Sequence, residues 1–333
     1  MRFLIVGLGS MGKRRIRNLL FLKADGVSGF DSRDDRRRES KKAYDIDTFD
    51  SFERAMDSGP DALIISTPPD MHMKYALEAA RQNIHFFTEA SVLADGMDRL
   101  IEILRDKKIV AAPSCTMRFH PSVRKLKSLV ETSEAGRPVA FTHHCGQYLP
   151  DWHPWEDYTK YYVARRETGG CREIVPFELI WLTWIFGEPE ALSCFKDKLS
   201  NLKADIDDVY QILLRFRTKI LGHMLIDVVS RVPYRSFRLL CEEGVITWEW
   251  GEAVKVYSAA SKTWKQHQEE KGTTVEGYAD KIKEEPYIEE MRCFINAIEG
   301  KDRFPYTFEE DRKALEMLYS AERSSDEGVH INM

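Results

Sequence analysis

The first third of the chain alternates short apolar runs with segments of helical period. The strand-like runs are residues 3–6, 27–30, 62–66 and 84–87, and the sequence IVAAP (109–113) ends the series. The helix-like segments are residues 11–22, 71–81 and 96–106. Strand and helix in regular turn predict a parallel sheet with helices on both faces. We therefore expect a doubly wound α/β domain over residues 1–120.

After Pro121, apolar and polar residues alternate over longer segments, as in strands with one buried face. These segments are DVYQILLRFR, ILGHMLIDVV, SFRLLCEE, VITWEW and AVKVYS. They predict consecutive antiparallel strands with one helix near residues 176–186. The polar stretch TWKQHQEEKGTTVEGYADKIKEE predicts an exposed loop that enters a helix, and two amphipathic helices end the chain. Residues 121–333 should form an α+β domain with a large, mainly antiparallel open sheet, and the last helices could pack back on the first domain.

Composition narrows the class of protein. A chain of 333 residues suits two domains, and no segment approaches the roughly 18 apolar residues of a membrane span. The start, MRFLIVGLGSMG, lacks a small-residue cleavage site, so we expect no signal peptide. A net charge of -5 argues against nucleic acid as a partner. Six scattered cysteines without a CxxC pair indicate reduced thiols, and we expect a soluble cytoplasmic protein without a metal site.

A glycine-rich turn follows the first strand and opens the first helix. It reads Gly7-Leu8-Gly9-Ser10-Met11-Gly12. The first glycine permits the tight turn, the second lets the backbone approach a pyrophosphate, and the third permits close packing of helix and strand. Asp31 ends the second strand, where a carboxylate can accept hydrogen bonds from ribose hydroxyls. The alternative is a glycine-rich turn without a ligand.

Asp31 favours NAD, because its charge would repel the 2′-phosphate of NADP. Arg33 and the arginines at 36–38 could attract that phosphate, or they could form a solvated helix start, which leaves NADP as an alternative. The loop STPPDMH (66–72) follows the strand at 62–66, at the carboxyl edge that binds ligands in such sheets. The predicted cofactor-binding residues are Gly7, Gly9, Ser10, Met11, Gly12, Asp31, Ser32, Arg33, Ser66, Thr67, Pro68, His72 and Glu89.

Five stretches together resemble the Gfo/Idh/MocA family of sugar and inositol dehydrogenases along nearly the whole chain. They are GLGSMGKRRIRNL, ISTPPDMHMKYALEAA, the glutamate of TEAS, RFHPSVRKLK, and GG…WLTWIFGEP. The stretch YLPDWHPWEDY (148–158) is similar to the substrate loop of a branch that acts on nucleotide-linked or nonulosonic-type sugars. The resemblance implies a Rossmann domain, an open sheet for substrate and oligomer contacts, and hydride transfer between NAD(P) and a sugar carbon.

The chain departs from this family at its catalytic positions. By the resemblance, Ala90 stands where the family has the lysine of Glu-Lys-Pro, Glu173 replaces an aspartate, and Phe177 replaces a histidine. Ile180 stands where relatives carry a further aspartate. Because a non-proline cis bond costs about 2.5–4 kcal/mol, the turn after Glu89 should be trans and reshaped, or strained. These departures predict a non-standard catalytic site.

Glu173 is the strongest candidate for a replacement acid or base, with an ion pair to Arg172 as the alternative. The other candidates are His143, His144, His153, Tyr158, Lys160, Tyr161 and Tyr162. We assign catalysis to Glu173, Glu89 and Tyr162, although Glu89 could instead only hold its loop. The predicted substrate-binding residues are Arg118, His120, Tyr148, Trp152, His153, Lys160 and Phe177. Several of them lie in the aromatic stretch DWHPWEDYTKYYVARRETGG (151–170), which could equally pack on a neighbouring subunit.

Three hypotheses for the function remain. The first is an NAD(P)-dependent oxidoreductase acting on a sugar or nucleotide-sugar derivative. The second is a catalytically lapsed nucleotide- and sugar-binding regulatory protein of the same fold, and the third is redox-neutral chemistry with transient use of bound NAD. In each case we expect a homodimer or homotetramer formed through the open sheet, with Trp248 and Trp250 among the candidates for its face.

Overall fold

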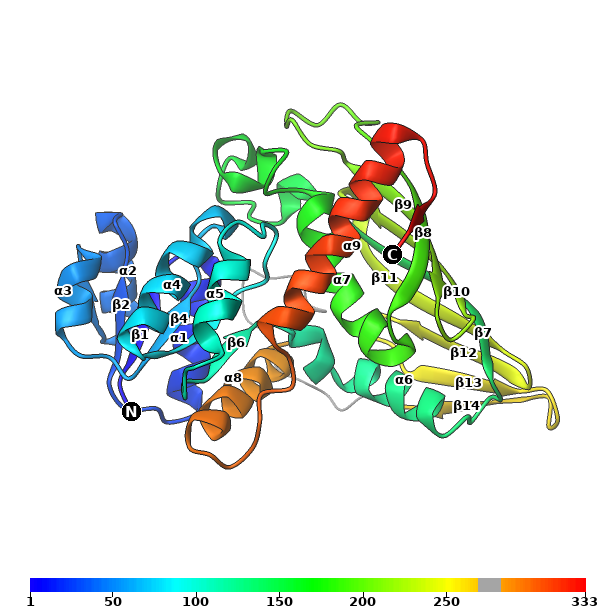
Figure 1. Cartoon of the computed structure of the whole chain (residues 1–333), viewed down its shortest axis with the longest axis horizontal. Helices are drawn as coiled ribbons and strands as arrows, with labels where there is room; N and C mark the ends of the chain where they lie inside the picture. The colour runs from blue at the N-terminus through cyan, green and yellow to red at the C-terminus, as the bar shows by residue number, and fades with distance from the viewer. Residues whose placement is uncertain (269–282) are drawn as a thin grey trace. The chain divides into compact units, whose positions relative to one another are not determined.

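The computed structural model describes residues 1–268 and 283–333, which form two compact units (Figure 1). The first unit comprises Met1–Thr116 and Glu284–Lys313, and the second comprises Met117–Lys283 and Ala314–Met333. The first segment therefore ends four residues before the boundary drawn at 120 from the sequence. The chain also returns to the first unit for α8 (Glu285–Ile298) and the start of α9 (Phe308–Glu327).

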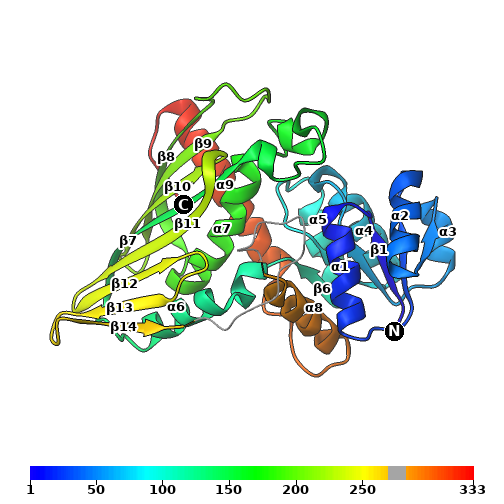
Figure 2. The ribbon, with the colours of Figure 1, turned by 180° about the vertical axis from the view of Figure 1, so that it is seen from behind.

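The first unit contains a parallel sheet of six strands in the order β3-β2-β1-β4-β5-β6. The strands are β1 (Phe3–Val6), β2 (Val27–Phe30), β3 (Asp47–Phe49), β4 (Ala62–Ile65), β5 (His85–Thr88) and β6 (Ala111–Pro113). Its other helices are α1 (Ser10–Phe21), α2 (Asp34–Tyr44), α3 (Phe52–Asp57), η1 (Pro69–Met71), α4 (His72–Gln82) and α5 (Met97–Leu104). Helices α4 and α5 cover one face and α1 and α8 the other (Figures 1 and 2). The predicted doubly wound fold is confirmed.

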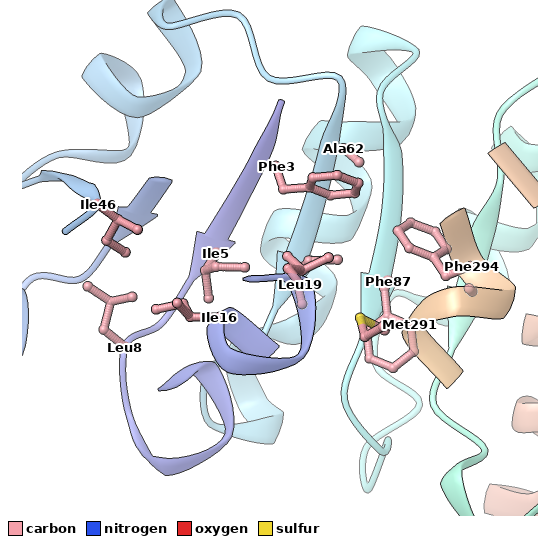
Figure 3. Close-up of a cluster of buried hydrophobic side chains, with 12 residues drawn as sticks. Phe3, Ile5, Leu8, Ile16, Leu19, Ile46, Ala62, Phe87, Met291 and Phe294 are labelled. Carbon is pink, nitrogen blue, oxygen red and sulfur yellow. The ribbon is translucent and has the colours of Figure 1, made fainter. Parts of the chain in front are cut away.

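The sequence pattern did not predict β3 or α3, and it anticipated α2 only as a solvated helix start at residues 36–38. Helix α2 reads DDRRRESKKAY and buries only Ser40, so it carries no apolar period that a pattern could reveal. Figure 3 shows why α8 belongs here: Met291 and Phe294 point toward Phe87 of β5, and the Phe87 and Phe294 rings lie 5.9 Å apart. An amphipathic helix almost 300 residues along the chain thus completes the core of the N-terminal sheet.

The second unit contains nine strands in the order β14-β13-β12-β11-β7-β10-β9-β8-β15. They are β7 (Pro138–Tyr148), β8 (Pro189–Asp197), β9 (Val209–Phe216), β10 (Leu221–Asp227), β11 (Val229–Cys241), β12 (Gly244–Glu249), β13 (Val254–Ser258), β14 (Thr263–His267) and β15 (Ile331–Asn332). Its helices are η2 (Thr116–Phe119), α6 (Pro121–Glu131), η3 (Leu149–Asp151), η4 (Tyr158–Lys160), η5 (Tyr162–Ala164) and α7 (Cys171–Phe186). The mainly antiparallel sheet is as predicted, although β7 pairs with β10 in parallel.

Two sequence predictions for this sheet were wrong. Residues 263–267 form strand β14, paired with β13, and not a loop; the rest of that predicted loop, residues 269–282, lies outside the described residues. Trp248 and Trp250 are 1% and 7% exposed, so they do not lie on an open face. Trp248 is paired with Phe237, which packs against Phe186 of α7, so its side chain belongs to the face that the helices cover.

The register places a row of apolar side chains on the opposite face. In β9, buried residues alternate with exposed ones, and Leu213 is 56% exposed. On the same face lie Phe195 (80% exposed), Leu221 (53%), Leu240 (44%) and Trp264 (49%). None of the helices in the described part of the second unit lies over this face in either view (Figures 1 and 2). We call these five residues the open-face row.

Candidate functional site

Two glycines of the loop, Gly7 and Gly12, stand where a side chain would clash with the backbone, and the third, Gly9, leaves room for a ligand. Gly7 has φ +96°, and a Cβ there would lie 2.7 Å from the carbonyl oxygen of Ser66. A Cβ on Gly12 would lie 1.9 Å from the carbonyl oxygen of Gly7. At Gly9 a Cβ would meet only the Arg36 side chain, at 3.4 Å. The loop is therefore tightly packed on its inner side and open to a ligand at Gly9.

Asp31 is fixed beside this loop at the end of β2. Its carboxylate accepts hydrogen bonds from the backbone N–H of Leu8 (2.8 Å) and of Arg33 (2.9 Å), and the side chain is 7% exposed. The arginines that could attract a 2′-phosphate already have acidic partners: Arg33 pairs with Asp35 and Arg38 with Asp34. This geometry favours ribose hydroxyls over a phosphate.

The start of α1 suits the pyrophosphate of a dinucleotide. No acidic residue lies in its first turn, and its N-cap residue, Gly9, has no side chain that could cap it. Ser10 begins the helix, and Met11 accepts a hydrogen bond from Arg14 through its sulfur (3.5 Å). Free N–H groups and the helix dipole favour an anion at such a position. Together with the space at Gly9 and the carboxylate of Asp31, these residues fit a dinucleotide cofactor.

The loops after β4 and β5 lie at the same carboxyl edge. Ser66 donates a hydrogen bond to Glu89 (3.1 Å), and Pro68 leads into η1. His72 is buried and its Nε2 lies 2.9 Å from the carbonyl oxygen of Thr67; burial lowers its pKa. In the loop after β2, the carbonyl oxygen of Ser32 accepts a hydrogen bond from Arg37. The predicted cofactor residues thus come from four loops, those after β1, β2, β4 and β5, at one edge of the sheet.

Glu89 is held by partners on both of its oxygens. Arg15 donates to Oε1 from Nε (2.7 Å) and to Oε2 from Nη2 (2.9 Å), and Ser66 donates to Oε1. No cis peptide bond occurs in the described residues, so the turn through Ala90 is trans. These contacts favour the role of holding the loop over the catalytic role that we also considered.

Glu173 lies in the first turn of α7, in the second unit. Tyr162 donates a hydrogen bond to its Oε1 (3.2 Å), while Oε2 is buried and has no hydrogen-bond partner among the described residues. Burial raises the pKa of Glu173 to about 7, against the opposing effect of the Tyr162 hydrogen bond. The alternative ion pair does not form, because Arg172 binds Glu322 (2.6 Å). Glu173 is therefore poised to exchange a proton near neutral pH.

The competing candidates for a base are engaged elsewhere in the second unit. His143 is 1% exposed and bonded to Glu178 (2.8 Å), and His144 lies on the other face of β7, bonded to Asp227 (2.7 Å). Tyr158 accepts a hydrogen bond from the backbone N–H of Lys203, and Lys160 is exposed and paired with Asp157 (3.4 Å). Of these candidates, only Tyr161 and His153 lie near Tyr162 and Glu173, and the Tyr161 hydroxyl oxygen is 3.1 Å from Nδ1 of His153.

The predicted substrate-binding residues do not share one environment. Arg118 and His120 are 5% and 6% exposed, and burial together with the charges of Arg235 and Lys283 lowers the pKa of His120 to about 3. Both side chains pack inside the second unit, where Arg118 donates to the carbonyl oxygen of Ile180 (3.4 Å). A buried neutral imidazole of this kind is better suited to packing than to proton exchange.

The remaining predicted residues are Tyr148 at the end of β7, Trp152 directly after η3, and Phe177 in α7. The Arg231 guanidinium lies 3.8 Å from the ring centre of Tyr148. Trp152 is partly buried, and its Nε1 is a buried donor without a hydrogen-bond partner among the described residues. Phe177 is partly buried in α7, one turn after Glu173.

Sequence reasoning missed two buried charge networks. In the first unit, Arg15 (0% exposed) binds both Glu89 and Glu290. In the second unit, Glu178 accepts hydrogen bonds from His143, Trp181 and Arg235. Glu178, within the apolar run PFELIWLTWIF, could have indicated the second network, because a charged side chain in a core is usually paired.

Neither a metal centre nor a membrane-spanning helix is present in the described part of the chain. Among residues 1–268 and 283–333, no group of three or more His, Cys, Asp or Glu side chains is arranged to hold a metal ion. In the same part of the chain, no helix is long and apolar enough to cross a membrane.

The sheet order, the glycine loop and Asp31 define a Rossmann-type dinucleotide-binding domain, joined to a second domain built on an open antiparallel sheet. The chain belongs to the Gfo/Idh/MocA oxidoreductase family. Residues 1–113 match the family's NAD-binding Rossmann fold, and residues 123–247 match the GFO/IDH/MocA C-terminal domain. The predicted family and its NAD-binding domain are thus confirmed.

The relatives cover the chain from end to end. A myo-inositol 2-dehydrogenase from Thermotoga maritima is 24% identical, over 100% of this chain and 98% of its own. An oxidoreductase from Agrobacterium radiobacter, solved with NAD+, L-tartaric acid and magnesium, has a TM-score of 0.88 at 13% identity, over 100% and 98%. The WlbA dehydrogenase from Bordetella pertussis, solved with NADH and UDP-GlcNAcA, has a TM-score of 0.82 at 19% identity, over 100% and 96%.

Proposed function

We propose that the protein is an NAD-dependent oxidoreductase that transfers a hydride between nicotinamide and a hydroxyl-bearing carbon of a sugar or nucleotide-sugar derivative. Glu173 is its general acid and base. The observation that carries this proposal is the buried, unpartnered Oε2 of Glu173, with a pKa raised to about 7. One relative is named for myo-inositol, and two similar structures were solved with L-tartaric acid and with UDP-GlcNAcA, which supports a polyhydroxylated substrate.

We assign cofactor binding to residues of the first unit and proton transfer to residues of the second. The N–H groups of α1 and the space at Gly9 hold the pyrophosphate, and Asp31 holds the adenosine ribose. When bound, the nicotinamide accepts or supplies the hydride. In the direction of oxidation, ionised Glu173 removes the hydroxyl proton as the carbonyl forms, and Tyr162 orients its carboxylate. In the direction of reduction, protonated Glu173 returns that proton.

The cofactor assignment is tested by titrating the purified protein with NADH and with NADPH. Energy transfer from tryptophan to the reduced nicotinamide reports binding. We expect saturable binding of NADH, weaker binding of NADPH, and a loss of about tenfold or more in NADH affinity for Asp31→Ala, which removes charge-assisted hydrogen bonds. Equal binding of both cofactors by the wild type would contradict the role given to Asp31.

Turnover is tested with a panel of polyols, sugars and nucleotide sugars, monitored by NADH formation. Glu173→Gln should abolish activity while leaving NADH binding unchanged, and Glu190→Gln, which removes an exposed carboxylate of the same unit, should change neither. Activity that survives Glu173→Gln would refute its role.

The catalytically lapsed alternative has its own supporting observation. Phe177 and Ile180 present apolar side chains in α7, and Ile180 is 3% exposed, so neither can exchange a proton. NADH binding without turnover on any member of the panel would favour this alternative. Turnover without net change in NADH would favour the redox-neutral hypothesis.

The open-face row supports self-association through the sheet, as a dimer or tetramer. An apolar row of this kind is unfavourable in water and is suited to pairing with a second copy. The six cysteines are free, four of them buried, which supports a reducing compartment such as the cytoplasm.

A further inference from the structure

Arg15 forms the centre of a buried charge cluster in the first unit. Its guanidinium binds both oxygens of Glu89 and, through Nη2, Glu290 (2.9 Å). It also lies 4.5 Å from the ring centre of Phe87. Arg15 and Glu290 are fully buried, and Glu89 is 13% exposed. The two carboxylates raise the pKa of Arg15 against the effect of its burial, so the arginine stays charged.

Both carboxylates of the cluster are bonded to the charged guanidinium of Arg15. Burial raises the pKa of Glu290, and the charge of Arg15 opposes that shift. Four donors surround its two oxygens: Ser114 Oγ (3.1 Å), the N–H of Cys115 (2.6 Å), Thr116 Oγ1 (2.7 Å) and Arg15. Each oxygen of Glu290 thus has one partner that can only donate, the N–H of Cys115 or Arg15, and this favours the ionised form. Glu89 likewise only accepts, so two negative charges face one positive charge and the cluster is net negative.

The cluster lies where the nicotinamide half of the cofactor belongs. Glu89 directly follows β5, and the residues bonded to Glu290 directly follow β6. In doubly wound sheets the ligand lies outside the carboxyl ends of the strands, and each half of the sheet serves one mononucleotide. Because Asp31 marks β2 as the adenosine side, β4 to β6 serve the nicotinamide side.

We propose that the cluster of Arg15, Glu89 and Glu290 sets which oxidation state of the cofactor this domain binds more tightly. The inference rests on the proposed NAD dependence. The nicotinamide ring carries a positive charge when oxidised and none when reduced. A net negative cluster beneath it stabilises NAD+ relative to NADH, and Arg15 limits that preference by neutralising one of the two carboxylates.

The test is the ratio of the dissociation constants for NAD+ and NADH, measured by calorimetry without substrate. Glu89→Gln removes a charge and keeps the size of the side chain. It should raise Kd(NAD+)/Kd(NADH) by about fourfold, the effect of one charge at about 10 Å and an effective dielectric constant of about 40. Glu89→Asp keeps the charge and alters the geometry, so it should leave the ratio unchanged even if both constants rise.

Two further variants complete the design. Asp61→Asn removes an exposed charge at the opposite end of β4 and should leave the ratio unchanged. If Glu89→Gln does not fold, Glu290→Gln carries the same expectation as Glu89→Gln. A ratio unchanged in the glutamine variant, or shifted equally by Glu89→Asp, would overturn the inference and leave the proposed function intact. A wild type that binds neither form of NAD would overturn both.

Discussion

At the scale of single residues, the glycines of the cofactor loop differ in what surrounds them. Gly12→Ala should destabilise the protein by about 3 kcal/mol or more, because its Cβ would meet the carbonyl of Gly7 at 1.9 Å. Gly9→Ala meets only the flexible Arg36 side chain, so it should keep the fold and weaken NADH binding. Urea unfolding and NADH titration of both variants check this pair. A Gly9→Ala variant that binds NADH like the wild type would exclude close backbone approach at that position.

Glu173 should give the reaction a characteristic pH dependence. Its pKa is raised to about 7, so the ionised base forms as pH rises through that value. We expect the kcat of oxidation to rise and the kcat of reduction to fall through about pH 7. Rate profiles in both directions measure this, and two profiles that rise together would contradict it.

The same raised pKa affects stability. Because folding raises the pKa of Glu173 from 4.5, the stability that the protonated carboxyl contributes is fully present below about pH 4.5 and is lost as pH rises through 7. Glu173→Gln, which cannot ionise, should therefore be more stable than the wild type at pH 8 by on the order of 1 kcal/mol, and by less at pH 5. Urea unfolding at the two pH values measures the difference.

At the scale of elements, a buried network joins α7 to strands β7 and β11. Burial by itself raises the pKa of Glu178, but Arg235, His143 and Trp181 outweigh it and hold the pKa at about 2. The stability from this carboxylate is present above the unfolded pKa of 4.5 and is lost as pH falls toward 2. The network therefore fixes the helix that carries Glu173 to the sheet.

Breaking this network should be costly, whereas replacing it should not. Glu178→Gln should lower the free energy of unfolding at pH 7 by about 3–5 kcal/mol, because it leaves Arg235 charged, buried and unpaired. The double replacement Glu178→Met with Arg235→Met should cost less than Glu178→Gln alone, because no unpaired charge remains. Urea unfolding of both variants measures this difference; a double variant less stable than the single one would argue against an electrostatic origin.

Element prediction succeeded where apolar residues repeat and failed where they do not. Strands β1 and β4 are fully buried apolar runs between turns, and β5 buries Phe86 and Phe87, so their sequences show the pattern directly. Helix α2 is polar on nearly all sides, and β14 is exposed along almost its whole length. Strand β14 depends on pairing with β13, which a local pattern does not show, and α2 lacks the apolar repeat by which a helix is recognised.

At the scale of the whole molecule, the open-face row predicts the oligomeric state. Leu213→Glu with Phe195→Glu places two charges on the exposed face of adjacent strands. If a second copy covers this face, the double variant should shift to a monomer in light scattering while NADH binding persists. Gln211→Glu with Arg215→Glu, two polar positions of the same face of β9, controls for charge alone. A wild type that is already monomeric would contradict the prediction.

The sequence alone predicted two domains, the glycine loop and the role of Asp31, because local spacing and apolar period indicate these features. The tertiary structure alone decided which side chains are paired. His143 and Glu178 lie 35 residues apart and Arg15 and Glu290 lie 275 apart, yet each pair is within 3 Å. Burial raises the pKa of Glu173, and the bond to Glu178 removes His143 as a candidate base. Burial and partners set the charge of a side chain, and local sequence does not fix them.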